Sequence, residues 1–120
     1  MKSFTDIEQS KQLADILPIE SADMLFQLGE DKYADSIRVT LTKEHWEQMM
    51  PDINPCWSLS ALLDVFRKID DNVEIWNNHE DWFVDVAICE TTSRDLLDAC
   101  VAMVQILHEK KIINFNNKED

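Results

Sequence analysis

The chain has 120 residues and a formal net charge of −13, and 45% of its residues are hydrophobic. This length and apolar fraction are typical of one globular domain with its own core and exclude an intrinsically disordered chain. The excess of carboxylates repels phosphate backbones and anionic membranes, so direct binding of nucleic acid or of a membrane is not expected.

The N-terminal residues predict a first helix. Thr5-Asp6-Ile7-Glu8 fits a capping box, in which Thr5 is the N-cap and Glu8 reaches back to its amide. Apolar residues recur at helical spacing as far as Leu17. Pro18 follows, and because it lacks an N–H group we expect it to end the helix.

Two strands and a short helix are expected next. The apolar run Met24–Leu28 and the alternating residues 33–41 predict two strands that form a hairpin across Gly29–Lys32. Thr42 is a candidate N-cap for a helix that ends at Met49.

The segment from Asn54 to Phe66 is the expected centre of the core. Its first residues, up to Cys56, predict a turn, and they are followed by Trp57 in apolar company. Ser58 is placed to cap a helix. That helix carries a row of apolar residues on one face: Leu59, Leu62, Leu63, Phe66 and Ile69. We expect the sheet and the last helix to pack against Trp57 and this face.

The second half of the chain predicts another hairpin and a long helix. Residues 73–76 and 82–88 have the composition of strands, and the polar loop 77–81 joins them. Thr92, with an acid three residues later, is a candidate cap for a helix over residues 94–111.

The order of these elements predicts an α+β fold. We expect one domain over residues 1–113, in which an antiparallel sheet of about four strands, formed by two hairpins, packs against three to four helices. Residues 114–120 are polar and predict a frayed tail.

The cysteines indicate a reducing compartment. Cys56, Cys89 and Cys100 are odd in number, have no CxxC spacing and lie in or beside apolar runs. Free thiols are common in such places, so a cytoplasmic protein with reduced cysteines is expected. The N-terminus has no apolar leader, and no apolar run approaches the about 18 residues that a membrane span needs.

Candidate catalytic chemistry is sparse. Cys56 precedes a predicted helix, and a helix N-terminus can activate a thiol nucleophile. A nucleophilic cysteine needs a histidine partner, and the histidines at 45, 79 and 108 are scattered without a supporting signature. We therefore favour the interpretation of Cys56 as a buried structural thiol. The sequence predicts no catalytic residue and no cofactor.

A metal site is not predicted either. His79-Glu80-Asp81 lies at the tip of the second hairpin and could touch a cation. Short loops of Asn, Asp and Glu are also ordinary turn sequences. The ligand spacing of zinc sites and calcium loops is absent.

The four tryptophans separate into two pairs. Trp57 and Trp82 lie in apolar company and are expected in the core. Trp46 and Trp76 have polar neighbours, and tryptophan is enriched in interface hot spots. Our candidate interface therefore consists of two tryptophans and the loop at the hairpin tip: Trp46, Trp76, His79, Glu80 and Asp81.

Three parts of the chain carry a resemblance: Lys11–Ala14 with Ile16–Met24, then Pro55–Leu63, then Asp98–Met103 with Leu107–Glu109. On these residues the chain is similar to a family of small uncharacterised proteins from gut-anaerobe bacterial genomes and their prophages or other mobile elements. The resemblance implies a genomic neighbourhood and brings no known activity, cofactor or catalytic residue.

Three hypotheses for function follow. The first is a small non-enzymatic accessory protein that binds a protein partner through its acidic surface and an exposed tryptophan. The second is an acidic inhibitor that mimics DNA and occupies a nucleic-acid-binding protein, which requires rows of carboxylates near the spacing of phosphates. The third is a small enzyme that uses Cys56 or a pair of carboxylates, which requires a pocket with perturbed titrating groups.

Overall fold

The fold is known from a computed structural model, which describes residues 2–27, 37–38, 42–49 and 53–113. Its helices and strands, with a 3-10 turn η1, follow in chain order: α1 (Ile7–Ala14), η1 (Ile19–Ser21), β1 (Met24–Gln27), β2 (Ile37–Arg38), α2 (Lys43–Met49), β3 (Ile53–Cys56), α3 (Leu59–Ile69), β4 (Glu74–Asn77), β5 (Trp82–Val86), β6 (Cys89–Ser93) and α4 (Leu96–Glu109).

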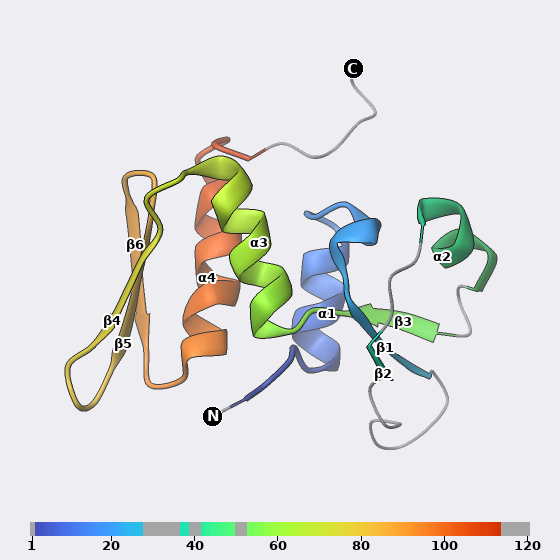
Figure 1. Ribbon diagram of the computed structural model, residues 1–120, viewed down its shortest axis with the longest axis horizontal. Coiled ribbons are helices and arrows are strands. Elements are labelled where there is room, and N and C mark those ends of the chain that lie inside the picture. The colour runs from blue at the N-terminus through green and yellow to red at the C-terminus, as the bar shows by residue number, and fades with distance from the viewer. Residues whose placement is uncertain (1, 28–36, 39–41, 50–52, 114–120) are drawn as a thin grey trace.

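The elements form layers across the molecule (Figure 1). A three-stranded antiparallel sheet, in the order β4-β5-β6, lies at one end, and α3 and α4 form the next layer. Beyond them lie α1 and a second antiparallel sheet, in the order β2-β1-β3, with α2 at the far end. The predicted α+β class is confirmed, and the strands are divided between two sheets.

Two strands were not predicted. Residues 54 and 55, expected in a turn, belong to β3, where Leu25 of β1 pairs with Pro55. Among the described strands β3 pairs only with β1, so it is an edge strand, in which proline's missing N–H group is tolerated. Thr92, expected to cap a helix, lies in β6, and the N-cap of α4 is Asp95, which accepts a hydrogen bond from the Asp98 amide.

The cap of α1 is also shifted by one residue from the prediction. Asp6 is the N-cap, and it forms a capping box with Gln9. Thr5 is fully buried, and its hydroxyl accepts a hydrogen bond from the Trp57 amide at 3.0 Å. The Thr5 hydroxyl, which was expected to cap the helix, is therefore used in a tertiary contact with Trp57. The end of α1 also differs from the prediction, since the helix ends at Ala14 and not near Leu17.

Other local predictions are confirmed. The Ser58 hydroxyl accepts from the Ala61 amide and caps α3, and the Thr42 hydroxyl accepts from the His45 amide at the start of α2. β1 pairs antiparallel with β2. The expected turn at Gly29–Lys32, most of the strand over residues 33–41 and the tail over residues 114–120 lie outside the described residues.

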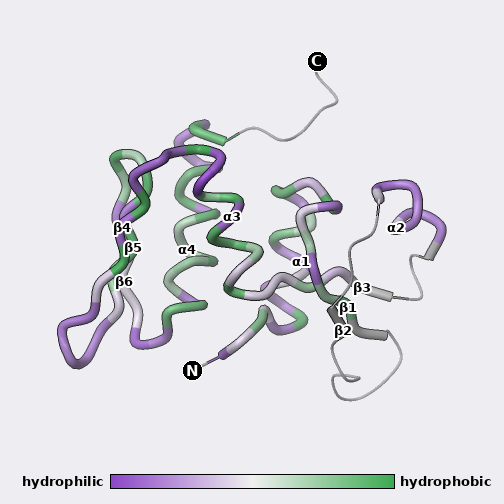
Figure 2. The backbone as a smooth tube through the Cα atoms, in the orientation of Figure 1, coloured by the Kyte–Doolittle hydropathy of each residue, from purple (hydrophilic) through white to green (hydrophobic). Residues whose placement is uncertain are grey.

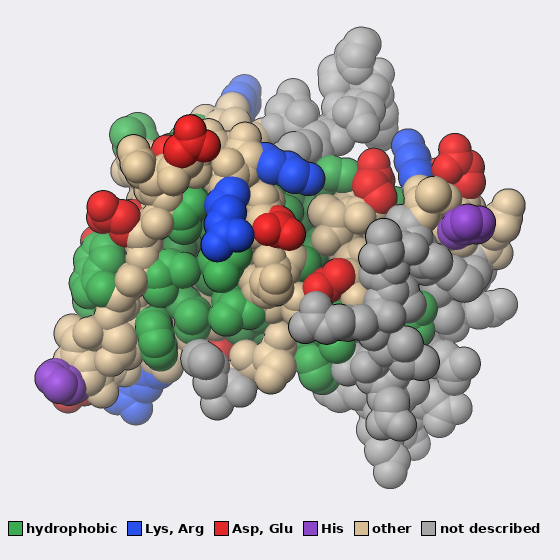
Figure 3. All heavy atoms as spheres, in the orientation of Figure 1, with side chains coloured by type: hydrophobic (Ala, Val, Ile, Leu, Met, Phe, Trp, Pro, Cys, Tyr) green, Lys and Arg blue, Asp and Glu red, His purple; other side chains and the backbone are tan. Residues whose placement is uncertain are grey.

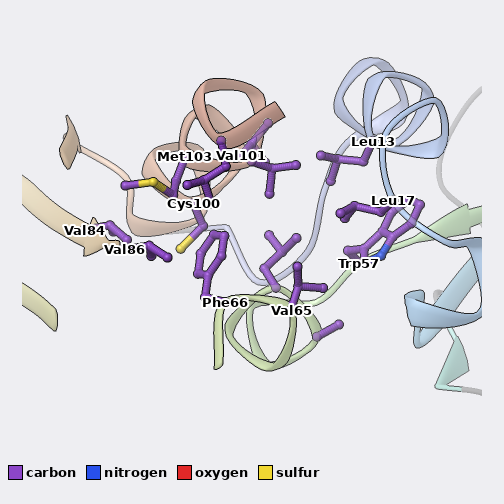
Figure 4. Packing of buried hydrophobic residues seen from close by; sticks show 14 of the residues in the cluster. Leu13, Leu17, Trp57, Val65, Phe66, Val84, Val86, Cys100, Val101 and Met103 are labelled. Carbon is purple, nitrogen blue, oxygen red and sulfur yellow. The ribbon is translucent and has the colours of Figure 1, made fainter. Parts of the chain in front are cut away.

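The main core lies between α3, α4 and the inner face of the β4-β5-β6 sheet (Figure 4). Phe66 of α3 faces Cys100 and Met103 of α4, with Val84 and Val86 of β5 beyond them. Figure 2 shows that hydrophobic residues concentrate on α4 and β5, whereas α2 and the loop between β4 and β5 are hydrophilic.

Lys2 forms ion pairs with residues at the starts of both α1 and α4. Its ammonium group lies 3.3 Å from Asp6 at the start of α1 and 2.9 Å from Asp98 in the first turn of α4. Partial burial alone would raise the pKa of Asp98, but the hydrogen bonds from Lys2 and Gln9 outweigh burial and lower it. The charged form of Asp98 is therefore the form that holds α1 against α4.

Trp57 is expected to contribute strongly to stability, because its side chain is fully buried and its indole N–H group donates to the Ser21 hydroxyl. We predict that Trp57→Ala lowers the free energy of unfolding by about 3–5 kcal/mol, as truncation of buried aromatic residues does. Urea denaturation followed by circular dichroism measures this loss. A loss below about 1 kcal/mol would contradict the central position of Trp57, since surface substitutions fall in that range.

Candidate functional site

One face of the β4-β5-β6 sheet has no described element packed on it. The helices lie on the opposite face, against which Val84, Val86 and Cys89 are buried. Because side chains alternate along a strand, every second residue points away from the helices. We call this set the outer sheet face: Glu74, Trp76, Phe83, Asp85, Glu90 and Thr92.

Three carboxylates lie in one row across the outer sheet face. Glu74 of β4 pairs with Asp85 of β5, and Asp85 pairs with Glu90 of β6. Side chains paired directly across antiparallel strands are about 4.5–5.5 Å apart at Cβ, and like charges in such pairs are destabilising. None of the three is in an ion pair within the described part of the chain, whose salt bridges involve other residues.

Asp85 is the central carboxylate of the row. Its Oδ1 atom is shielded from solvent and has no hydrogen-bond partner among the described residues. A shielded carboxylate oxygen is costly unless a donor satisfies it. The row therefore combines mutual repulsion with an acceptor that is unsatisfied among the described residues, and a cation at this face would relieve the repulsion.

An aromatic pair lies beside the row. The rings of Trp76 and Phe83 are parallel within 5°, with their centroids 5.2 Å apart. Trp76 stays 40% exposed although it is a large apolar side chain. The predicted exposure of Trp76 is confirmed, and its place on the outer sheet face makes it the one predicted interface tryptophan that remains a candidate.

The loop at the tip of the β4-β5 hairpin is built by asparagine side chains. Asn77 accepts from the His79 amide at 2.9 Å, and Asn78 accepts from the amides of Glu80 and Asp81 at 3.2 and 2.8 Å. His79 adopts a φ of 88°, which this turn requires. The loop follows Trp76 directly, so the structure brings these predicted residues to one end of the outer sheet face.

Trp46 was predicted as an exposed interface residue, and the structure contradicts this. Its side chain in α2 is completely buried, with no hydrogen-bond partner for the indole Nε1 among the described residues. The polar neighbours that suggested exposure are the solvent-facing residues of an amphipathic turn, including Glu44 and Glu47. Trp46 also lies at the opposite end of the molecule from β4 (Figure 1).

The thiols show no sign of activation. All three cysteines are free and buried. Burial raises the pKa of Cys56 to about 11, and the hydrogen bonds with Thr5 and Ser10 offset this only in part. Burial, with a smaller effect of the Asp95 charge, raises the pKa of Cys100 to about 12. These values describe inert thiols, so Cys56 is not supported as a nucleophile.

The described residues contain neither a candidate metal site nor a candidate membrane span. Within the part of the chain that the structure describes, no three ligand side chains of the His, Cys, Asp or Glu type come together in a way that could hold a metal ion. Among the same residues, no helix has the length and apolar character needed to cross a membrane.

These features define an α+β protein with an open sheet face that is both acidic and aromatic. Comparison with protein-family models, with curated proteins and with solved structures gives no match.

Sequence reasoning missed most of this site. Asp85 and Phe83 were placed in a strand, but their β6 partners Glu90 and Thr92 were not, because residues 89–93 contain few large apolar side chains. The β-branched pair Thr91-Thr92 was the available signal for a strand. If β6 had been predicted, the alternation of side chains along β5 and β6 would have placed Asp85 and Glu90 on one face of the sheet.

The first prediction concerns the thiols, because only the thiolate form is nucleophilic enough to attack alkylating and disulfide reagents. We expect no cysteine of the native protein to react with Ellman's reagent at pH 8 within minutes, and all three to react once the chain is unfolded in guanidinium. Absorbance at low reagent concentration measures this. Fast reaction of one thiol in the native protein would contradict this expectation and would support the hypothesis of a reactive cysteine.

The second prediction concerns the carboxylate row. Glu90→Gln removes one of the charges that repel Asp85, so it should raise the free energy of unfolding by about 0.2–1 kcal/mol at low ionic strength. The gain in free energy of unfolding should vanish in 1 M salt, because the Debye screening length is then only about 3 Å. The matched control is Glu47→Gln, an exposed acid on α2, which should change little. An equal gain for both variants would contradict local repulsion in the row.

Proposed function

We propose that this protein is a small non-enzymatic accessory protein of the cytoplasm that binds a basic segment of a protein partner on its outer sheet face. The observation that carries the proposal is the carboxylate row of Glu74, Asp85 and Glu90 beside the exposed Trp76. The six residues of this face include no lysine or arginine. Electrostatic complementarity of this kind sets partner choice and speeds association.

The energetics of the face support binding. Cations of a partner would replace repulsion among the three carboxylates with attraction. Trp76 offers apolar area that is partly exposed and fixed by its stack on Phe83, so little side-chain entropy is lost on binding. Tryptophan is among the residues that are enriched at interface hot spots.

The other findings agree with a binding role. The raised pKa values of Cys56 and Cys100 disfavour an enzyme that uses these thiols, and the resemblance to proteins of prophages and mobile elements implies a genomic neighbourhood for the protein. The binding role itself is inferred from the outer sheet face.

A second candidate function is mimicry of DNA, and the in-register carboxylates are the observation that favours it. A mimic needs such rows to continue over a larger surface. On the face seen in Figure 3, acidic and basic side chains are intermixed. On α3, Arg67 forms an ion pair with Asp64 at 3.6 Å. DNA mimicry is therefore the second candidate function, and competition between duplex DNA and the bound partner distinguishes it from the first.

The test compares two triple variants with the same change in net charge. The site variant carries Glu74→Gln, Asp85→Asn and Glu90→Gln. The control variant carries Glu8→Gln, Asp15→Asn and Glu47→Gln, at exposed positions on α1, at its C-cap and on α2. Each protein is immobilised and exposed to lysate of the source organism. The retained proteins are identified by mass spectrometry, and each is then purified and titrated.

We expect a partner that binds the wild type and the control variant with similar affinity and the site variant at least about tenfold more weakly, which corresponds to the loss of one or two charge-assisted contacts. Equal binding to the two triple variants would contradict the proposal. Displacement of the partner by duplex DNA would favour mimicry over a general accessory role.

A further inference from the structure

The free face of the Trp76 indole is the most specific feature of the outer sheet face. One face of the ring stacks on Phe83 of the neighbouring strand. β4 is an edge strand, since among the described strands it pairs only with β5. The other face of the ring is therefore directed toward the open edge of the sheet, which agrees with its 40% exposure.

Glu74 lies two residues before Trp76 and on the same face of β4. Two residues span about 6.8 Å along a strand, so a carboxylate and an aromatic face are presented side by side. A planar cation that stacks on the ring at the usual distance, within about 6 Å of its centroid, lies within reach of the Glu74 side chain. Next to it in the row lies Asp85, whose Oδ1 atom has no donor among the described residues.

We propose that the outer sheet face selects arginine, and that an arginine of the partner stacks on the free face of Trp76 while its guanidinium N–H groups pair with Glu74. This inference rests on the proposed function and names the anchor of the partner. A guanidinium is planar, stacks on aromatic rings and carries five donors in a fork, so it satisfies the ring and the carboxylate together. A lysine ammonium is strongly hydrated and compact, and it pairs with the carboxylates without the planar stack.

The experiment uses two octapeptides with blocked ends, one of alternating Arg and Ser and one of alternating Lys and Ser. The two peptides carry the same charge, so the general attraction to the acidic face is the same for both. Each is titrated into the full chain at low ionic strength by calorimetry and by NMR of the Trp76 indole N–H resonance. Trp76→Leu removes the aromatic face and keeps an apolar side chain.

We expect the wild type to bind the Arg peptide about two- to five-fold more tightly than the Lys peptide, as a cation–π contact at an exposed site provides. The Trp76 resonance should shift with the Arg peptide. In Trp76→Leu the preference should disappear while both peptides still bind, and the circular dichroism spectrum confirms that the variant is folded.

The outcomes separate the two proposals. If both peptides bind the wild type equally and the site variant binds neither, arginine selection is wrong and the charge-based docking function stands. If the preference persists in Trp76→Leu, the stack on Trp76 is wrong. If neither peptide binds the wild type, both the arginine anchor and the acidic docking face are overturned.

Discussion

The rest of the fold depends on the hydrogen bonds that join Trp57 to two other parts of the chain. Its amide and carbonyl groups are hydrogen-bonded to Thr5, and its indole N–H group donates to Ser21, so the N-terminal residues and the segment before β1 are fixed to the same point. The next residue, Ser58, caps α3 and is hydrogen-bonded to Asp23. Segments that are distant in sequence therefore meet where α3 begins.

This junction has consequences for the candidate site. It fixes the start of α3, whose apolar face, with that of α4, covers the inner face of the β4-β5-β6 sheet. Once those helices have buried Val84 and Val86, the alternation of the strands leaves Asp85 and Phe83 outward. Core packing thus supplies the free energy that holds three like charges in register, and the outer sheet face can keep an arrangement that is unfavourable for the isolated protein.

Much of the fold could be predicted from local patterns. The Ser58 cap with the apolar face of α3, and the polar loop between β4 and β5, are signals carried by residues close in sequence. Prediction failed where a long-range partner decided the outcome. Thr5 caps nothing because Trp57 takes its hydroxyl, and Pro55 lies in a strand because β1 pairs with it on one side only.

The sequence by itself determined the α+β class, the acidic character and the amphipathic helices, because each of these depends on composition or on periods of a few residues. Only the tertiary structure decided which tryptophan is exposed and which carboxylates are neighbours. Trp46 and Trp76 have similar polar flanks, yet packing buries the first and leaves the second at a sheet edge. The row of Glu74, Asp85 and Glu90 exists only through strand register, which joins residues whose proximity no local pattern encodes.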